Sequence, residues 1–308
     1  MLSVVFAVLV GLIAGIVINV LADEIPYRRG LWWPTYPDGA RRPPTAWLGL
    51  LAFILGQREP KQPEPNEAHA RPHLGHNRLG WRYPLVELAA IGLMLLAVFA
   101  TRDDSGMTAA QLVFYWVELA ILLLIFVTDI ELRMIYRIVT RPALVIALLD
   151  ALLLPVLAPG IKDAAAGTAF GFGIFYLIYL GGVLFVKVIT RSSGEVSNTG
   201  NPQQEENSEN QAEANEDTED EEIVAFGFGD VRLMAFCGAL LGFLGTFLAM
   251  FIAIFLGAIG AIVYLIGKRF LSGQYSAFSP IPYGPYIIIA TIIVMFYREP
   301  VAAAVFGW

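Results

Sequence analysis

Two aspartates at the edges of apolar stretches are the residues best suited to chemistry in this sequence. Asp129 ends one hydrophobic run, and Asp230 begins another, directly after Gly227-Phe-Gly. A carboxylate at the edge of a membrane segment is costly unless it has a partner or a task. Two carboxylates that face each other cannot both ionise cheaply, so they would share a proton. The charged member could then activate a water as general base, while the protonated member polarises a peptide carbonyl.

The same carboxylate pair is compatible with two other functions, which the residues alone leave open. It could be a proton relay in a proton-coupled transporter, or a structural contact between helices in an inactive assembly scaffold. Asp230 is also a candidate helix N-cap, because Asp accepts backbone hydrogen bonds at helix starts. Gly227 and Gly229 lack a Cβ atom, which leaves room either for a substrate backbone or for close packing of another helix.

The composition indicates an all-α polytopic membrane protein. Of the 308 residues, 57% are hydrophobic, and several apolar runs approach the ~20 residues that cross a hydrocarbon core. The net charge of −7 is not distributed evenly, because residues 192–222 hold eleven acidic residues and no Lys or Arg. The remainder of the chain is therefore about +4 by subtraction, which gives no basis for expecting a nucleic-acid partner.

The apolar runs predict about eight transmembrane helices. One run, 231–266, is too long for a single helix and suits two that turn near residues 242–245. The other runs each suit one helix, and they are 2–22, 83–100, 110–128, 138–157, 164–189 and 287–297. The acidic tract 192–222 has no apolar periodicity, so we expect a disordered loop between the fifth and sixth helices.

The basic residues predict the orientation of the chain in a plasma membrane. Lys and Arg concentrate in alternate loops, at 23–82, 129–141, 187–191 and 268–269. By the positive-inside rule these loops are cytoplasmic and the N-terminus is outside. Three units follow: a first transmembrane helix at 1–22, a long cytoplasmic loop at 23–82, and a membrane-embedded core at 83–308. Asp129 and Asp230 fall on the same, cytoplasmic side and could meet.

The stretch from Gly227 to Leu233 resembles the GxGD motif of the type IV prepilin peptidases, a family of polytopic aspartic proteases. Four other stretches resemble segments of that family in the same order, and they are 11–20, 82–88, 129–140 and 281–286. Five matches in order cover nearly the whole chain, whereas a single GxGD would be weak evidence. One departure lies within the motif, where Arg232 stands in place of the usual lysine.

The resemblance implies that Asp129 and Asp230 are the catalytic pair. It also implies that the chain cleaves the basic leader from a prepilin or pseudopilin precursor at the cytoplasmic face, without a cofactor. Gly227, Gly229 and Arg232 would then support the motif. Asn19 and Glu87 lie in two of the resembling stretches, so we expect them to support the substrate or the loop, although an ion pair of Glu87 with Arg82 is an alternative. A buried amide at position 19 needs a hydrogen-bond partner.

The long loop departs most from the family. Many members carry two CxxC pairs there, which bind zinc, and methylate the new N-terminus with S-adenosylmethionine. This loop has no cysteine. The positions of those pairs are occupied by His69, His73 and His76, but we expect a flexible polar loop that does not bind zinc. S-adenosylmethionine would be needed only if methylation is retained. The apolar patch 46–56 is too short to span and is predicted to lie on the membrane surface.

The remaining polar and small residues of the apolar runs are predicted to serve packing. Glu118 and Asp150 lie well inside their helices, which favours interhelical hydrogen bonding over catalysis. The single cysteine, Cys237, is expected to be inert. Small residues allow helices to approach closely, and the ones assigned this role are Gly167, Gly171 and Gly173. The identity of the precursor and the oligomeric state are not specified by the sequence.

Overall fold

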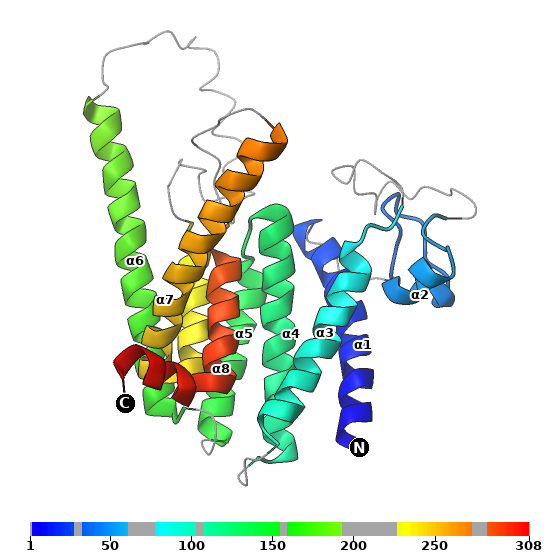
Figure 1. The fold of residues 1–308 in the computed structure, drawn as a ribbon, viewed down its shortest axis with the longest axis horizontal. Helices are drawn as coiled ribbons and strands as arrows, with labels where there is room; N and C mark the ends of the chain where they lie inside the picture. The colour runs from blue at the N-terminus through cyan, green and yellow to red at the C-terminus, as the bar shows by residue number, and fades with distance from the viewer. Residues whose placement is uncertain are drawn as a thin grey trace, which may run out of the picture.

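The computed structural model describes residues 2–27, 33–60, 78–102, 107–154, 159–192, 227–272 and 282–307. Within these ranges the regular elements are helices, which confirms the predicted all-α class (Figure 1). The α-helices are α1 Leu2–Glu24, α2 Gly49–Ile54, α3 Arg82–Ala100, α4 Ala109–Leu132, α5 Arg137–Leu153, α6 Ile161–Ser192, α7 Phe228–Ser272 and α8 Gly284–Phe306. The three histidines and residues 193–222 of the acidic tract lie outside the described residues.

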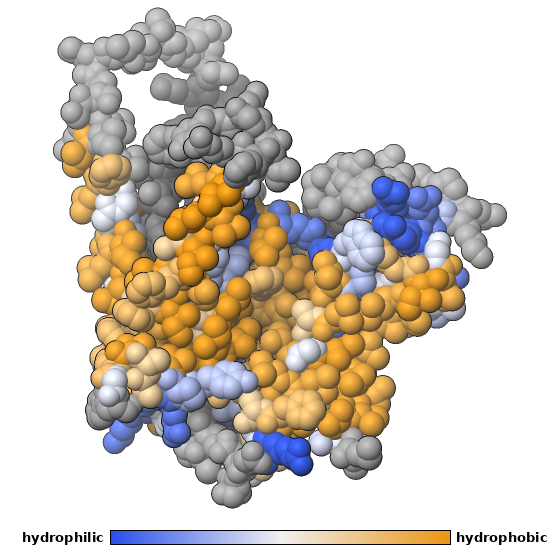
Figure 2. Space-filling model, viewed as in Figure 1, coloured by the Kyte–Doolittle hydropathy of each residue, from blue (hydrophilic) through white to orange (hydrophobic). Residues whose placement is uncertain are grey.

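Six of the described helices are long and apolar enough to cross a membrane, namely α1, α3, α4, α6, α7 and α8. Figure 2 shows their apolar side chains as a band, with hydrophilic residues gathered at the upper and lower ends of the bundle. The chain is therefore a multi-pass membrane protein. The count of eight spans stays a prediction, because it requires the 17 residues of α5 and each half of α7 to cross separately.

Helix α7 contains the turn that was predicted near residues 242–245. Its 45 residues are interrupted at Gly242, whose φ of 68° and ψ of −177° are not helical. This backbone region is essentially restricted to glycine. After the break, Phe247 stacks on Phe306 near the end of α8, with ring centroids 6.2 Å apart. Gly257 lies instead against Tyr283, just before α8 begins. The second half of α7 therefore runs antiparallel to α8, and the long apolar run is two helices, as predicted.

Replacing Gly242 by Ala is expected to lower the free energy of unfolding by about 1–3 kcal/mol, because Ala cannot easily adopt this conformation. An added Cβ would also collide with Asp163, whose Oδ1 accepts a hydrogen bond from Phe243 N at 3.0 Å. The measurement is the unfolding midpoint in detergent. Gly92→Ala is the control, because nothing lies within 4 Å of its added Cβ. Equal midpoints for the two variants would contradict the prediction.

Small residues bring α6 against the first half of α7. Added Cβ atoms at Gly167 and Gly238 would lie 2.6 Å or less from the backbone of the opposite helix, and Gly171 lies against Met234. The close packing predicted for Gly167 and Gly171 is confirmed. The prediction is wrong for Gly173, since nothing lies within 4 Å of its added Cβ.

Residues 33–60, which we call the α2 segment, fold into a small unit at the upper end of the bundle (Figure 1). A buried cluster joins it to the start of α3, and its members are Tyr36, Ala40, Ala46, Ala52, Leu79 and Tyr83. The segment is also held by Arg58, whose guanidinium donates to Leu79 O at 2.9 Å. The flexible polar loop predicted around the three histidines lies outside the described residues, whereas the α2 segment is folded. The aromatic side chains of the α2 segment pack against apolar residues at the first turn of α3. This contact cannot be predicted from the local sequence.

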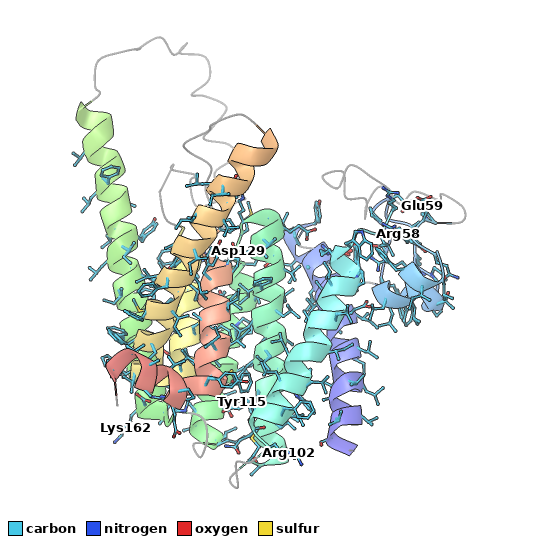
Figure 3. The ribbon with its side chains drawn as sticks, in the orientation of Figure 1. Arg58, Glu59, Arg102, Tyr115, Asp129 and Lys162 are labelled. Carbon is cyan, nitrogen blue, oxygen red and sulfur yellow. The ribbon has the colours of Figure 1, made fainter. Side chains whose placement is uncertain are left out.

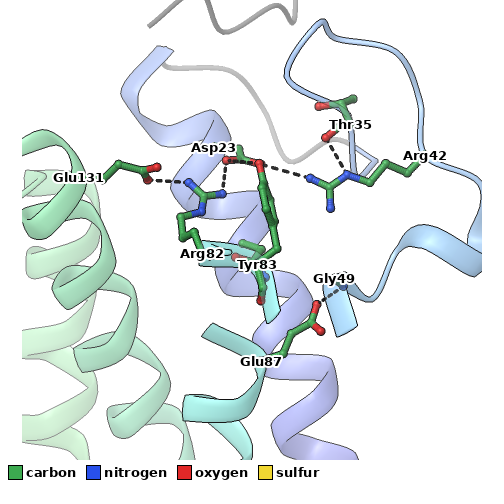
Figure 4. A network of polar contacts seen from close by, with 9 residues as sticks. Asp23, Thr35, Arg42, Gly49, Arg82, Tyr83, Glu87 and Glu131 are labelled. Carbon is green, nitrogen blue, oxygen red and sulfur yellow. Dashed lines mark hydrogen bonds and ion pairs between the residues drawn. The ribbon is translucent and has the colours of Figure 1, made fainter. Parts of the chain in front are cut away.

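Glu87 is the main polar link between the α2 segment and the membrane helices. It is fully buried, and its two carboxylate oxygens accept hydrogen bonds from Gly49 N at 2.6 Å and Leu50 N at 2.9 Å (Figure 4). It therefore caps the start of α2, and the alternative of an ion pair with Arg82 is wrong. Asn19 donates to Tyr83 O at 3.2 Å on the same side of the bundle, which supplies the partner that its buried amide requires.

Replacing Glu87 by Gln is expected to weaken the docking of the α2 segment by about 1–3 kcal/mol, because charge-assisted hydrogen bonds are lost. The backbone amides of α2 would then exchange hydrogen faster, whereas those in the middle of α4 would not change. Hydrogen exchange followed by mass spectrometry measures both regions in one sample. Unchanged exchange in α2 would contradict the capping role.

Candidate active site

Asp129 lies in the last turn of α4. The helix ends at Arg133, which adopts the left-handed conformation with φ 55° and ψ 34°, and whose N–H donates to Asp129 O at 2.9 Å. This is a helix C-cap built on a residue other than glycine, and it turns the chain sharply toward α5. Asp129 is only 5% exposed. Figure 3 shows it in the upper half of the bundle, far from Arg102 and Lys162 at the opposite end.

Asp230 lies in the first turn of α7. The helix begins at Phe228, and the Asp230 N–H donates to Gly227 O at 3.2 Å. The prediction that Asp230 caps the helix is therefore wrong, since Gly227 precedes the helix and Asp230 is its third residue. The unpaired N–H groups of a first helical turn favour a negative charge beside them. The side chain is half-buried.

The start of α8 interacts with both aspartates. Gly284 packs against the Asp129 carboxylate, whose Cγ would lie 3.1 Å from an added Cβ. Its neighbour Tyr283 interacts electrostatically with Asp230, and the two aspartates interact with each other. Burial and the Asp230 carboxylate both raise the pKa of Tyr283 above its usual value, so its hydroxyl stays protonated. The site thus combines the end of α4, the start of α7 and the start of α8.

The two glycines of the motif have different surroundings. An added Cβ at Gly229 would lie 3.0 Å from Ile135 Cβ, in the turn between α4 and α5, so this glycine allows close packing beside the aspartates. Gly227 is exposed, and its added Cβ would meet only Gly229 N, at 3.9 Å. Among the described residues, therefore, Gly227 and not Gly229 has no close neighbour on this side of its backbone. Arg232 places its guanidinium 4.6 Å from the centre of the Phe228 ring, which supports the first turn of α7.

The Asp129 carboxylate lies within reach of the Gly284 backbone N–H, and its buried Oδ2 atom makes no well-aligned hydrogen bond to the described residues. Buried polar atoms nearly always have a partner, because leaving one unsatisfied costs about 1–3 kcal/mol. Such an atom is therefore suited to receive a water or a substrate group. Together with the neighbouring Asp230, it forms an arrangement that can share a proton and activate a water.

Two other acidic residues interact with each other, away from this site. Glu118 on α4 and Asp150 on α5 are buried and interact electrostatically. One oxygen of each, Glu118 Oε1 and Asp150 Oδ1, has no hydrogen-bond partner among the described residues. The two carboxylates therefore interact across two helices, while the interhelical hydrogen bonding expected of them stays a prediction. Cys237 is buried within α7, in agreement with its assignment to packing.

Several residues at or near the site do not have the positions or the roles that the sequence suggested. Tyr283, Gly284 and Ile135 were not singled out as site residues, although the Pro-Tyr-Gly-Pro stretch does mark the start of α8. Asn19 and Glu87 were expected to support the substrate or the loop. Their hydrogen bonds hold the start of α3 and the α2 segment, so support of the loop is the role that the structure describes.

A zinc centre of the four-cysteine kind does not fit this chain. Its only cysteine is Cys237, which is buried among apolar residues of α7. Among the residues that the structure describes, no group of three or more His, Cys, Asp or Glu side chains could hold a metal ion. The two aspartates therefore have no third ligand from the described part of the chain.

Comparison with protein families found a match for part of the chain. The model of the type IV leader peptidase family matches residues 116–262. This range contains Asp129, Asp230 and both glycines of the motif, and it leaves out the α2 segment and the whole of α8. Searches of curated proteins and of solved structures found no match.

Proposed function

We propose that this chain, whose residues 116–262 match the model of the type IV leader peptidase family, is an aspartic endopeptidase of the plasma membrane. Its substrates are type IV prepilin or pseudopilin precursors, from which it removes the basic leader. The observation that supports the aspartic mechanism is the electrostatic interaction between the carboxylates of Asp129 and Asp230, the first of which lies against the start of α8. Both lie within the matched range.

In the proposed reaction the two carboxylates share one proton. The ionised carboxylate takes a proton from a water, whose oxygen bonds to the carbonyl carbon of the scissile peptide. The other carboxylic acid gives its proton to the carbonyl oxygen, which produces a tetrahedral diol. As the carbon–nitrogen bond breaks, the protonated carboxyl gives its proton to the leaving amine, and the ionised carboxylate takes a proton from one hydroxyl of the diol, which leaves the pair with one proton again. In this proposal an extended peptide approaches the pair along the backbone of Gly227, which is exposed among the described residues.

The proposed location of the reaction is the cytoplasmic face. The upper end of the bundle carries the α2 segment and Asp129, whereas the N-terminus lies at the lower end (Figures 1 and 3). The positive-inside rule favours the upper end as cytoplasmic. A precursor would then insert its hydrophobic stem beside the helices, in the bilayer, and leave its basic leader near the acidic pair, where charge attraction helps binding.

The proposal does not include methylation of the new N-terminus with S-adenosylmethionine. In the family that activity accompanies a cysteine-bound zinc in the long loop, and this chain has no cysteine there. Peptide cleavage by the aspartate pair needs neither group.

The test of the proposed function is processing of a precursor with a basic leader in membranes that contain this chain. The expected result is a product shortened by the leader, detected by mass spectrometry of its new N-terminus. Membranes with the Asp129→Asn, Asp230→Asn double variant are the control and should leave the precursor intact. Equal processing in both samples would exclude an aspartic mechanism. Intact precursor in both, with proton-driven solute uptake by the unaltered chain, would favour a transporter.

A further inference from the structure

Three charged side chains from three helices form a network close to Asp129, which we call the Asp23–Arg82–Glu131 network (Figure 4). Arg82 Nη1 lies 2.6 Å from Glu131 Oε2, and Arg82 Nη2 pairs with Asp23 Oδ1. The side chain of Asp23 is 4% exposed, that of Arg82 18% and that of Glu131 23%. Ion pairs that are shielded from water depend strongly on every partner, because removal of one leaves an uncompensated charge.

Each charge in the network lies at the helix end that disfavours it. Asp23 is the penultimate residue of α1, and Glu131 is the penultimate residue of α4. Arg82 is the first residue of α3. Helix dipoles favour anions at N-termini and cations at C-termini, which is the opposite arrangement. The three charges therefore do not stabilise their own helices through the helix dipole. They compensate one another where the ends of three helices lie close together.

The network acts on the same helical turn that carries Asp129. Glu131 follows Asp129 by two residues, so the two side chains point to opposite sides of α4, about 200° apart. Asp129 contacts Gly284 on one side, and Glu131 binds Arg82 on the other. The last turn of α4 has no basic residue of its own, and the final carbonyls of a helix lack intrahelical partners. Arg82 supplies the missing cation from α3.

The α2 segment is joined to the same network through Arg42. The Arg42 guanidinium lies 3.8 Å from Asp23 Oδ2 and 4.3 Å from the centre of the Tyr83 ring. Its Nε donates to Thr35 O at 2.8 Å. The hydroxyl of Tyr83 donates in turn to Asp23 Oδ2 at 3.1 Å. Asp23 thus connects a segment outside the matched range with the turn that holds Asp129.

We propose that Arg82 is a positioning residue that fixes the last turn of α4, and with it Asp129, through Glu131, and that Asp23 couples this turn to the α2 segment. This inference rests on the proposed function for its kinetic consequence. Arg82 suits the task better than lysine, because its planar guanidinium reaches two carboxylates from separate nitrogens, whereas an ammonium is a single point charge.

The test measures both activity and local order in purified protein. Arg82→Gln is expected to lower kcat for leader cleavage by roughly 10-fold to 100-fold, because a small displacement of a catalytic group has effects of that size. KM should stay within about twofold, since the network does not contact the peptide. Amides of residues 129–133 should exchange hydrogen several times faster than in the unaltered chain. Arg82→Lys should show a smaller fall in kcat and a smaller increase in the exchange of these amides.

A second variant keeps the test decisive if Arg82→Gln does not fold. Glu131→Gln removes one partially exposed partner and leaves the Arg82–Asp23 pair, so it should fold and still lower kcat. The control is Arg141→Gln, which alters an exposed arginine near the start of α5 and should leave kcat and exchange unchanged. Normal kcat and normal exchange in Glu131→Gln would overturn the inference, as would a rise in KM alone. Failure of the unaltered chain to cleave would refute the proposed function, while hydrogen exchange would still decide the role of Arg82.

Discussion

Asp129→Asn and Asp230→Asn are each expected to lower the rate of leader cleavage by about 10²-fold to 10⁴-fold, the usual contribution of a positioned acid or base. Asn keeps the size of the side chain but cannot exchange a proton with water or with the leaving amine. Because the two carboxylates work as a unit, the double variant should be little slower than either single variant. If the two carboxylates contributed independently, the rate losses of the single variants would multiply in the double variant.

The measurement is cleavage of a precursor by purified variants at equal concentration, with kcat and KM determined separately. Glu118→Gln is the matched control, because it neutralises another buried carboxylate of α4 that interacts with Asp150 and not with the pair. It should retain kcat within about twofold, since it makes no contact with the proposed reacting groups. Normal cleavage by either single aspartate variant would refute the proposal that the two aspartates form a catalytic pair. An equal loss of kcat in Glu118→Gln would show that this loss is not specific to the two aspartates.

The parts of the fold that depend on local composition could be predicted from the sequence. Apolar runs gave the helices, since about 20 apolar residues in a row have few other stable environments. The break in 231–266 was foreseen because the run is too long for one helix, and the structure places it at Gly242. The alternation of basic loops placed Asp129 and Asp230 at one end of the bundle, where their carboxylates interact.

The parts that depend on contacts between distant segments could not be predicted. Glu87 caps a helix that begins 38 residues earlier in the chain, and no spacing rule connects the two positions. The ion pairs of Arg82 likewise join three helix ends. Asp230 was taken for an N-cap because residue type alone does not reveal whether α7 begins at Phe228 or two residues later. Each case requires knowledge of which helix ends lie together.

Gly284 is another residue whose role depends on which helix ends lie together. Replacing it by Ala is expected to lower kcat by roughly 100-fold. An added Cβ would collide with the Asp129 carboxylate and lie 3.5 Å from Ile135 Cδ1. The carboxylate is the end of a side chain, so it can rotate away from the new methyl group without unfolding the helix. Asp129 would then no longer face Asp230. Ala also favours the first turn of α8 more than Gly does, so the unfolding midpoint should change little.

This separation of activity from stability distinguishes a site glycine from a packing glycine. Gly173→Ala is the control, because nothing lies within 4 Å of its added Cβ, and it should change neither kcat nor the midpoint. In the Asp129→Asn background, Gly284→Ala should cause almost no further loss, since the carboxylate that it displaces is already absent. A full additional loss there would mean that Gly284 acts independently of Asp129. Normal kcat in Gly284→Ala alone would mean that the pair tolerates a displaced Asp129.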